Sequence, residues 1–310
     1  MSKAKISTTE IARICGVSQG TVDRALNNRK GISAKNKEKI LNVAKEYGYR
    51  PNIHASSMAG GKSRLIGVVI FDLDNSYFSD MLMRIESYCN SLGYFAIVMF
   101  TNKDHKKEIE CIQNLYHMSV DGIIHCPANG GEEYENYLLS LAIPIVTFGN
   151  KLNGFPCAGI DNRQAMTETV TFVASKGYTH LIYVKPALTE RNTFAQTERL
   201  NGFMAACDKS NLPYTITSLQ NAPKELRKDK RNAFICPTDI YAIQLLSVAQ
   251  RHQAGIVGFD NIRLIDELGL CLDSVAYNIK AAAKAATDYL IEGKAVPPYI
   301  THKLVRRGSI

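Results

Sequence analysis

The chain has 310 residues, of which 45% are hydrophobic and 21% are charged. This is ordinary globular composition for two or three domains, so it excludes wholesale disorder and a fibrous repeat. No run approaches the roughly 18 uninterrupted apolar residues that a membrane helix needs, and the start of the chain has no apolar signal region, so we expect a cytoplasmic protein without a membrane partner. The eight cysteines are scattered without a C-x-x-C pair, which favours free thiols over a disulfide framework.

The net charge of +8 is concentrated at one end of the chain. Residues 1–64 hold 13 Lys and Arg against 4 Asp and Glu, a net charge of +9, whereas the remainder has a net charge of −1. A small basic segment on a near-neutral body is typical of a nucleic-acid-binding module attached to a larger domain. A basic disordered tail is the alternative, and the helical periodicity of the segment argues against it.

Residues 7–26 show the pattern of two short helices. Ser7 and Glu10 fit the S-x-x-E capping box that opens a helix, and Gly16 suits the left-handed position that ends one. Ser18 is then the N-cap candidate of a second helix over residues 19–26. Two helices joined by so few residues predict a helix-turn-helix, in which the N-terminal residues of the second helix face base edges in the major groove.

A third helix is predicted over about residues 34–46, between the N-cap candidate Ser33 and Gly48. A plain three-helix bundle is the alternative for the whole segment. The positive charge and the polar outer face of the second helix favour DNA binding instead.

Residues 12–27 read A-x-x-x-G-V-S-x-x-T-V-x-R-x-L-N, and Gly-Tyr-Arg-Pro-Asn follows at residues 48–52. These residues resemble the headpiece of the LacI/GalR family of bacterial transcription regulators. The resemblance implies a DNA-binding headpiece over residues 1–49, a hinge helix and linker over residues 50–63, and an effector-binding and dimerisation domain over residues 64–310. The headpiece residues that it assigns to the DNA contact are Ser18, Gln19, Gly20, Thr21, Arg24 and Ser33.

By position in the family motif, Gln19, Gly20 and Arg24 are the base-reading residues. Arginine can fork onto the O6/N7 edge of guanine, and glutamine can pair with the N6/N7 edge of adenine. Gly20 departs from the family pattern because it offers no side chain, and inside a helix glycine costs about 1 kcal/mol relative to alanine. Thr21 and Ser33 are interpreted as phosphate contacts, which set register and carry no sequence information.

The segment over residues 51–62 is short, rich in small residues and closed by a double glycine, as a flexible tether would be. The resemblance implies instead a hinge helix from Asn52 to about Ala59, which folds only on operator DNA and pairs there with the hinge of a second subunit. Met58 stands where the family usually has Leu, an apolar wedge that kinks the duplex from the minor groove. The hinge residues expected at the DNA are Asn52, His54, Ala55 and Met58.

From residue 65 onward, short apolar runs alternate with amphipathic segments, which predicts βαβ units and parallel sheets in two lobes. The predicted fold class is therefore an all-α helix-turn-helix headpiece joined to an α/β body of two Rossmann-like lobes. The predicted strands are residues 65–70, 95–100, 122–126, 145–148, 180–184, 233–236 and 255–259. The predicted helices of the body are residues 77–91, 105–118, 163–176, 198–210 and 240–252.

The resemblance implies that the two lobes are periplasmic-binding-protein-like and are joined by three strand connections. We expect the connections near residues 158–162, 273–277 and 298–302. The N-lobe is expected to contain about residues 64–159 and 277–298, and the C-lobe about residues 160–275 and 300–310.

The body lacks the motifs of the common enzyme classes. It has no G-x-G-x-x-G after the first strand, no G-x-x-x-x-G-K-[ST] and no G-x-S-x-G, so nucleotide-dependent and serine-nucleophile catalysis have no motif to rest on. The seven histidines form no metal-binding cluster, and the segment from Asp72 fails as a calcium loop because Tyr77 and Met83 occupy key positions. We therefore expect a protein that is not an enzyme and has no cofactor and no metal.

Ligands of such folds bind beyond the carboxyl ends of the strands. Residues 72–78 resemble the family's D-x-x-N-P-F-F segment, whose aromatic pair lines the effector site, although the alternative for Tyr77 and Phe78 is helix-start core. Arg199 precedes an L-x-G-F run, and Asp260 belongs to a G-F-D run; a cap or an inter-lobe salt bridge is the alternative for Asp260. The residues that the resemblance assigns to the effector are Tyr77, Phe78, Arg191, Thr193, Arg199, Asp239 and Asp260.

Carboxylates, a guanidinium and an aromatic face across a cleft suit a polyhydroxy ligand, so the expected effector is a sugar or a sugar derivative. The favoured function is a ligand-responsive transcriptional repressor that binds a palindromic operator as a homodimer. The alternative is an α/β small-molecule-binding or enzymatic protein whose basic head serves another nucleic acid. The second lobe is short for the family. Residues 211–232 are charged and show no clear helical stripe, and the helix predicted over residues 240–252 runs almost at once into the next strand, where the family usually has a longer link.

Overall fold

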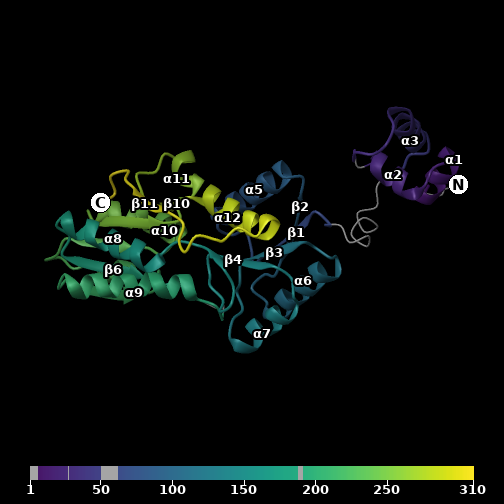
Figure 1. Cartoon of the computed structure of the whole chain (residues 1–310). Helices are drawn as coiled ribbons and strands as arrows, with labels where there is room; N and C mark the ends of the chain where they lie inside the picture. Colours follow the sequence, from purple (N-terminus) through teal and green to yellow (C-terminus); the bar gives the residue numbers. More distant parts are fainter. Residues whose placement is uncertain (1–5, 27, 50–61, 188–190) are drawn as a thin grey trace. The chain divides into compact units, whose positions relative to one another are not determined.

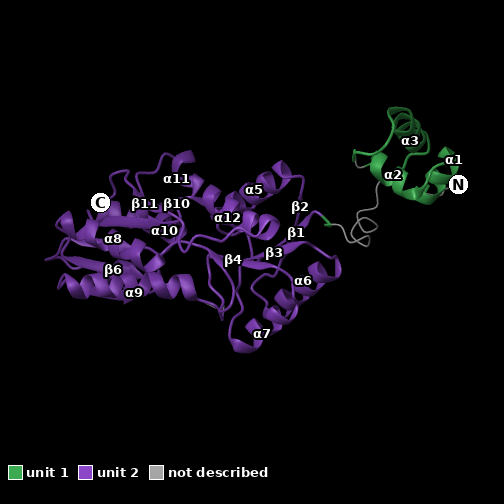
Figure 2. Cartoon of the chain, viewed as in Figure 1, with its two compact units in different colours: residues 1–63 green, residues 64–310 purple. Residues whose placement is uncertain are grey.

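The computed structural model describes residues 6–26, 28–49, 62–187 and 191–310. The chain divides into two compact units, residues 1–63 and residues 64–310, which Figure 2 shows in different colours.

The described residues of the first unit form three packed helices, as the sequence predicts (Figure 1). The capping box is complete, because the Ser7 side chain accepts from the backbone N–H of Glu10 while the Glu10 side chain accepts from that of Ser7. Gly16 ends the first helix with φ of 68°, a conformation that glycine adopts without a Cβ penalty. The helices are α1 (Thr8–Cys15), α2 (Gln19–Leu26) and α3 (Ala34–Glu46). Each contributes one fully buried residue to the core, namely Ile11, Val22 and Ile40.

The N-lobe of the second unit is a five-stranded parallel sheet in the order β2-β1-β3-β4-β5. Helices α5 and α12 pack on one face of this sheet, and helices α6 and α7 pack on the other, so the central strands are buried on both sides. The strands are β1 (Leu65–Ile70), β2 (Phe95–Phe100), β3 (Gly122–His125), β4 (Ile145–Phe148) and β5 (Cys157–Ala158). The helices are α5 (Ser76–Ser91), α6 (His105–His117), α7 (Glu132–Ser140) and α12 (Ile279–Glu292).

The C-lobe is a six-stranded sheet in the order β11-β10-β9-β8-β6-β7, in which only the β10–β11 pair is antiparallel among the described strands. Its strands are β6 (His180–Val184), β7 (Tyr214–Thr217), β8 (Asn232–Ile235), β9 (Gly255–Phe259), β10 (Asp273–Tyr277) and β11 (His302–Val305). Its helices are α8 (Asn162–Ser175), α9 (Phe194–Lys209), α10 (Asp239–Arg251), α11 (Arg263–Glu267) and the short 3-10 helix η1 (Ala222–Glu225).

The chain crosses between the two lobes three times. The first connection joins β5 to α8, the second joins β10 to α12, and the third joins α12 to β11. Residues that follow strands of both sheets, such as Asp72 after β1 and Asp260 after β9, line one cleft.

The structure contains four strands that the sequence does not predict, and it shifts the ends of two predicted strands by one residue. Strands β5, β7, β10 and β11 have no counterpart among the predicted strands, and the strands predicted over residues 122–126 and 233–236 cover residues 122–125 and 232–235. Strands β5, β7 and β11 lie at the edges of their sheets, where a strand has one neighbour and shows no continuous apolar run. Helix α9 begins at Phe194, four residues before the predicted start.

Candidate DNA-binding and effector sites

The exposed face of α2 presents the residues expected to read bases. Arg24 is exposed, and its guanidinium makes no hydrogen bond or ion pair with another described residue, so this group is available to a ligand. Gln19 donates from Nε2 to the Thr8 hydroxyl at 3.1 Å, a contact between α1 and α2 that DNA would have to replace or use. A Cβ built on Gly20 would lie 3.9 Å from Ser18 Oγ and meet nothing closer, so the missing side chain is not required by packing.

Three further headpiece residues, Ser18, Thr21 and Ser33, lie at the N-termini of helices α2 and α3. The Ser18 hydroxyl accepts from the backbone N–H of Thr21 at 3.2 Å and lies 2.9 Å from the Thr21 hydroxyl. The Ser33 hydroxyl accepts from the backbone N–H of Asn36 at 3.3 Å and so caps α3. These polar groups at helix N-termini favour phosphate contacts. The hinge residues Asn52, His54, Ala55 and Met58 lie outside the described residues.

A cavity of about 300 Å³ lies between the two lobes of the body. Its walls combine aromatic rings with amide, carboxylate and cationic side chains, the mixture that small polar ligands require. The lining residues that the sequence assigns to the effector are Tyr77, Phe78, Thr193, Arg199 and Asp260. The polar residues that join them include Asp72, Asp74, Asn75, Lys103, Asn150, Asn192 and Gln196.

Asp260 and Arg199 form the charged centre of the cavity. Asp260 Oδ2 accepts from Asn75 Nδ2 at 2.7 Å, and its Oδ1 lies 3.5 Å from Arg199 Nη1. Arg199 also donates to the Asn162 side chain at 2.9 Å and to the Pro237 carbonyl oxygen at 2.6 Å, while its guanidinium stacks 3.7 Å from the centroid of the Phe259 ring. These contacts hold the Arg199 guanidinium group in a fixed orientation beside the cavity.

The backbone of Asp260 has φ of 103°, which is unusual for a residue with a side chain. Such a conformation is retained only where the surroundings fix it, and here it directs a carboxylate toward the cavity. Burial raises the pKa of Asp260, although the neighbouring Arg199 and the Asn75 hydrogen bond act in the opposite direction. The Asn75 bond also joins the two lobes, because Asn75 starts α5 and Asp260 follows β9.

Asp239 has a different environment from the one that the resemblance implies. It is fully buried and is absent from the residues that line the cavity. Its Oδ2 accepts from the backbone N–H of Ile262 at 2.8 Å, and its Oδ1 accepts from the Ser274 hydroxyl at 2.5 Å. A Cβ built on Gly258 would lie 2.1 Å from Asp239 Oδ1, so the glycine leaves room for this carboxylate. These contacts tie α10 to the neighbouring strands inside the C-lobe.

The aromatic wall of the cavity is formed by rings in mutual contact. Phe78 packs edge-on against Phe71 at 4.7 Å and against Tyr77 at 5.1 Å between ring centroids. Tyr77 in turn lies 4.9 Å from Tyr277, a contact between the N-lobe and the end of β10. Tyr77 is buried and also lines the cavity, so it belongs to the core and forms part of the aromatic wall.

The structure places Arg191 on the surface and outside the cavity lining, whereas its neighbour Asn192 is buried and lines it. Asn192 also bridges the lobes, since its backbone N–H donates to the Ala128 carbonyl at 3.0 Å and its side chain donates to the Lys151 carbonyl at 2.9 Å. Asn150 completes this bridge by donating to the Asn192 carbonyl and accepting from the backbone N–H of Ala195.

A buried network supports the N-lobe side of this bridge. Glu108 is fully buried and accepts hydrogen bonds from the backbone N–H groups of Ala128 and Asn129, both at 3.2 Å. The Tyr134 hydroxyl donates to the same carboxylate at 2.8 Å, and His125 Nε2 lies 3.1 Å from it. The loop on which Asn192 docks is therefore held by a carboxylate whose oxygens are all used inside the lobe.

Several residues of the cavity were not anticipated from the sequence, among them Asn150, Gln196 and Tyr277. Asn150 follows β4 and Tyr277 ends β10, so both lie where parallel strands finish. A search for polar and aromatic residues after each predicted strand would have found Asn150, whereas Tyr277 needs a strand that the sequence does not predict.

Neither a metal-binding group nor a membrane-spanning helix is found in the described part of the chain. No three His, Cys, Asp or Glu side chains there come together as metal ligands. None of the helices of the described residues has both the length and the apolar character that a bilayer crossing requires.

Comparison with known protein families assigns both units. Residues 7–52 match the model of the bacterial regulatory proteins of the lacI family, and residues 63–234 match the model of the periplasmic binding proteins and sugar binding domain of the LacI family. Catabolite control protein A of Priestia megaterium is 28% identical, with 92% of each chain covered. The HTH-type transcriptional regulator DegA of Bacillus subtilis is 29% identical, with 89% of this chain and 88% of that protein covered.

Solved structures show the same fold. The lac repressor dimer bound to operator and an anti-inducer matches with a TM-score of 0.83 and 18% identity, over 99% of this chain and 100% of that one. The complex of the transcriptional regulator CelR with cellobiose matches with a TM-score of 0.66 and 17% identity, over 98% of this chain and 99% of that one.

Proposed function

Because the chain belongs to the LacI/GalR family of bacterial transcription regulators, we propose that it is a dimeric repressor whose affinity for a palindromic operator depends on a small hydroxylated effector. The observation that carries the proposal is the inter-lobe cavity centred on Arg199 and Asp260, in a chain that also has a helix-turn-helix. DegA of Bacillus subtilis is an HTH-type transcriptional regulator, and this supports a regulatory rather than a catalytic role.

The DNA contact is proposed to run through α2. Arg24 and Gln19 carry the base recognition, Thr21 and Ser33 contact phosphates, and the hinge adds Asn52, His54, Ala55 and the Met58 wedge. The free guanidinium of Arg24 on the exposed face of α2 supports this assignment. The net charge of +9 on residues 1–64 supplies the attraction to the phosphate backbone.

The dimer is proposed to form through the edge of the N-lobe. Strand β2 is the outer strand of its sheet, and its residue Phe95 is 61% exposed, with Val98 and Phe100 also exposed. Met83 on α5 adds a further exposed apolar side chain. An exposed apolar strand edge is an aggregation hazard unless something covers it, and a second copy of the chain would cover both edges at once.

The effector is proposed to be a sugar or a sugar derivative bound between the lobes. Asp260 can accept hydrogen bonds from hydroxyl groups, Arg199 can donate to ring or hydroxyl oxygens, and Phe78 offers an apolar face. The CelR structure contains cellobiose, and it supports a carbohydrate as the class of ligand for this fold.

Ligand and DNA are proposed to be coupled through lobe closure. The Asn75–Asp260 bond and the Asn150–Asn192 bonds join the lobes at the cavity, so a ligand that enters must replace some of these bonds or add to them. A ligand shifts the closure angle only by the difference in its affinity for the two arrangements. A change of angle would alter the spacing of the two hinges of a dimer, with a coupling of about 1–3 kcal/mol.

Two variants test this coupling, one in the effector cavity and one in the hinge. The sugar used is first found by thermal-shift screening, and the operator is first found by selection from random duplexes. Asp260→Ala should abolish the effect of the sugar on DNA binding while the ligand-free affinity for operator stays close to wild type. Met58→Gly should weaken operator binding while the affinity for the sugar stays intact. Calorimetry measures the sugar, and fluorescence anisotropy measures the operator. A full response of Asp260→Ala to the sugar would show that the carboxylate is structural or that the ligand binds elsewhere.

A further inference from the structure

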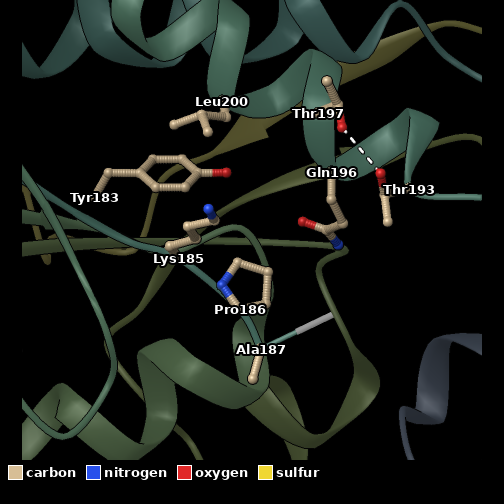
Figure 3. A pocket seen from close by; sticks show the side chains of 8 residues that line it. All are labelled: Tyr183, Lys185, Pro186, Ala187, Thr193, Gln196, Thr197 and Leu200. Atoms are coloured by element: carbon tan, nitrogen blue, oxygen red, sulfur yellow. Dashed lines mark hydrogen bonds between the residues drawn. The ribbon is translucent and has the colours of Figure 1, made fainter. Parts of the chain in front are cut away.

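A second cavity, of about 450 Å³, lies in the C-lobe beside the first (Figure 3). It is bounded by the end of β6, by residues 185–187, and by the N-cap and first two turns of α9. The two cavities share a wall, because Pro186, Ala187, Thr193 and Gln196 line both. The second cavity is therefore an immediate neighbour of the inter-lobe cleft.

Two polar atoms of this cavity have no hydrogen-bond partner among the described residues. Tyr183 is fully buried, and its hydroxyl is unpartnered although its ring packs against Phe203 at 4.9 Å. The Oε1 atom of Gln196 is also buried and unpartnered. Most buried polar groups in native proteins make a hydrogen bond. Two buried polar atoms without one in the same cavity therefore indicate a place for a hydrogen-bonding ligand.

The polar atoms of the cavity point the same way. Figure 3 shows the Tyr183 hydroxyl, the Lys185 ammonium group and the Gln196 amide oxygen directed into the space between β6 and α9. The hydroxyls of Thr193 and Thr197 are occupied with each other at 3.1 Å. Among the described residues that line the cavity, Lys185 alone carries a charge.

These atoms define the chemistry of a partner. Burial raises the pKa of Tyr183 well above its ordinary value, so the phenol stays protonated at neutral pH and can donate. Tyr183 and the Lys185 cation together provide two donors, which an anionic oxygen group satisfies with charge-assisted bonds. Gln196 Oε1 needs a donor, which a ligand hydroxyl provides. The apolar side chains of Leu200 and Pro186 can pack against a carbon skeleton.

We infer that this cavity is a second effector subsite that takes an anionic group, a carboxylate or a phosphate, carried by a hydroxylated ligand that also occupies the inter-lobe cleft. The effector is then an acidic sugar, such as a sugar acid or a sugar phosphate. This inference rests on the proposed effector-binding function and adds to it the charge and the extent of the ligand.

The test compares matched neutral and acidic sugars on the full-length chain by calorimetry at fixed ionic strength. The probes are hexoses and hexose disaccharides, each beside its uronate and its phosphate, and the two acidic forms are run separately so that the response identifies the anion. The variants are Tyr183→Phe and Lys185→Met. The control is Lys209→Met, which removes an equal charge at the other end of α9.

The wild-type chain should bind at least one acidic sugar about tenfold or more tightly than its neutral form. Tyr183→Phe and Lys185→Met should each remove most of this preference while the affinity for the neutral sugar and the behaviour of Lys209→Met stay unchanged. Tyr183→Phe should melt at the same temperature as the ligand-free wild type or higher, because it deletes an unpartnered buried hydroxyl. A loss of acidic preference in this well-folded variant is an effect that a purely structural tyrosine would not produce.

Two results would overturn the inference. If neutral sugars bind and acidic sugars bind no better, or if the preference survives both substitutions, the cavity is not an anion subsite, while the effector proposal stands. If no member of the panel binds, the assignment of an acidic sugar is wrong. Operator selection with the ligand-free chain then decides the DNA-binding function independently.

Discussion

Two aspartates, Asp239 and Asp260, show what a single residue contributes to this site. Both follow the carboxyl end of a C-lobe strand, and the resemblance assigns both to the effector. In the structure only Asp260 lines the cavity, whereas Asp239 bonds to Ile262 and Ser274 inside the lobe. Position in the sequence cannot distinguish the two environments, because the direction of each side chain depends on neighbours such as Gly258.

Asp239→Asn is predicted to remove one source of pH dependence from the stability of the fold. Burial, followed by the charge of Asp260, raises the pKa of Asp239 to about 8, whereas the unfolded side chain titrates near its ordinary value of about 4. Between these values the folded state keeps a proton that the unfolded state has lost. The free energy of unfolding therefore falls as pH rises, by at most about 1.4 kcal/mol per pH unit from this group.

The measurement is urea denaturation of wild type and variant between about pH 5 and pH 9. Asparagine resembles the protonated carboxyl, so the variant should gain stability relative to wild type up to about pH 8, and the difference should then level off. Its affinity for the effector should be unchanged. A constant stability difference over this range would contradict a raised pKa, and a loss of effector binding would return Asp239 to the binding site.

The residues of the cavity were partly predictable. Tyr77, Phe78, Thr193, Arg199 and Asp260 are assigned from motif positions and lie in the lining, although their contacts with an effector remain a prediction. The amide residues that bridge the lobes were not predictable, because they lie in short connections where neither periodicity nor a motif indicates direction. Of the proposed subsite residues, Tyr183 lies in a predicted apolar strand and Gln196 lies two residues before the predicted helix over residues 198–210, so neither position indicates a ligand.

At the scale of elements, helix α2 carries one residue that departs from the family motif for DNA recognition. Gly20 lies in the first turn of α2, where the family motif places a residue with a side chain. Nothing in the packing requires the glycine, because a Cβ there would meet only Ser18 Oγ at 3.9 Å. The glycine therefore leaves open space on the proposed DNA-facing side of α2.

Gly20→Ala is predicted to stabilise the headpiece by up to about 1 kcal/mol, since alanine restricts the unfolded chain and favours the helix. Amide hydrogen exchange of α1, α2 and α3 in the full-length chain measures the effect, and the exchange of the second unit serves as the internal control. Faster exchange in α2 would mean that the glycine has a local role that the ligand-free packing does not show.

The elements also show where periodicity succeeds. The predicted bounds of α2, α3 and the strands β1, β2, β4, β6 and β9 agree with the structure, because these segments have apolar residues at the spacing of a helix face or in a short continuous run. Strand β7 lies within the charged segment over residues 211–232 and is only partly buried, so its sequence lacks that signal. Strand β10 lies inside its sheet, but from the sequence we expect only a connection between the lobes at residues 273–277.

At the scale of the whole molecule, charge is separated along the chain. The net charge of +9 on residues 1–64 and of −1 on the rest predicts that only the first unit is attracted to DNA. The logarithm of operator affinity should fall linearly with the logarithm of salt concentration, with a slope of about −0.9 for each phosphate contact of the dimer.

A salt titration by fluorescence anisotropy measures this slope, with two variants as comparisons. Lys5→Ala, at a position outside the described residues, should weaken all duplexes evenly and reduce the slope. Arg24→Ala should weaken the operator by about 1–3 kcal/mol and relax preference at one base pair. A slope near zero, or equal losses of Arg24→Ala on operator and random DNA, would contradict the assignment of α2.

The central claim is sequence-specific binding of two α2 helices to a symmetric operator, and selection from a random duplex library tests it most directly. The full-length chain is taken through rounds of binding and amplification at moderate salt, beside Arg24→Ala. We predict that the wild type enriches an inverted repeat and that Arg24→Ala loses preference at the same base pair of both half-sites. Enrichment of no sequence, or of one without two-fold symmetry, would contradict the proposed dimeric operator binding.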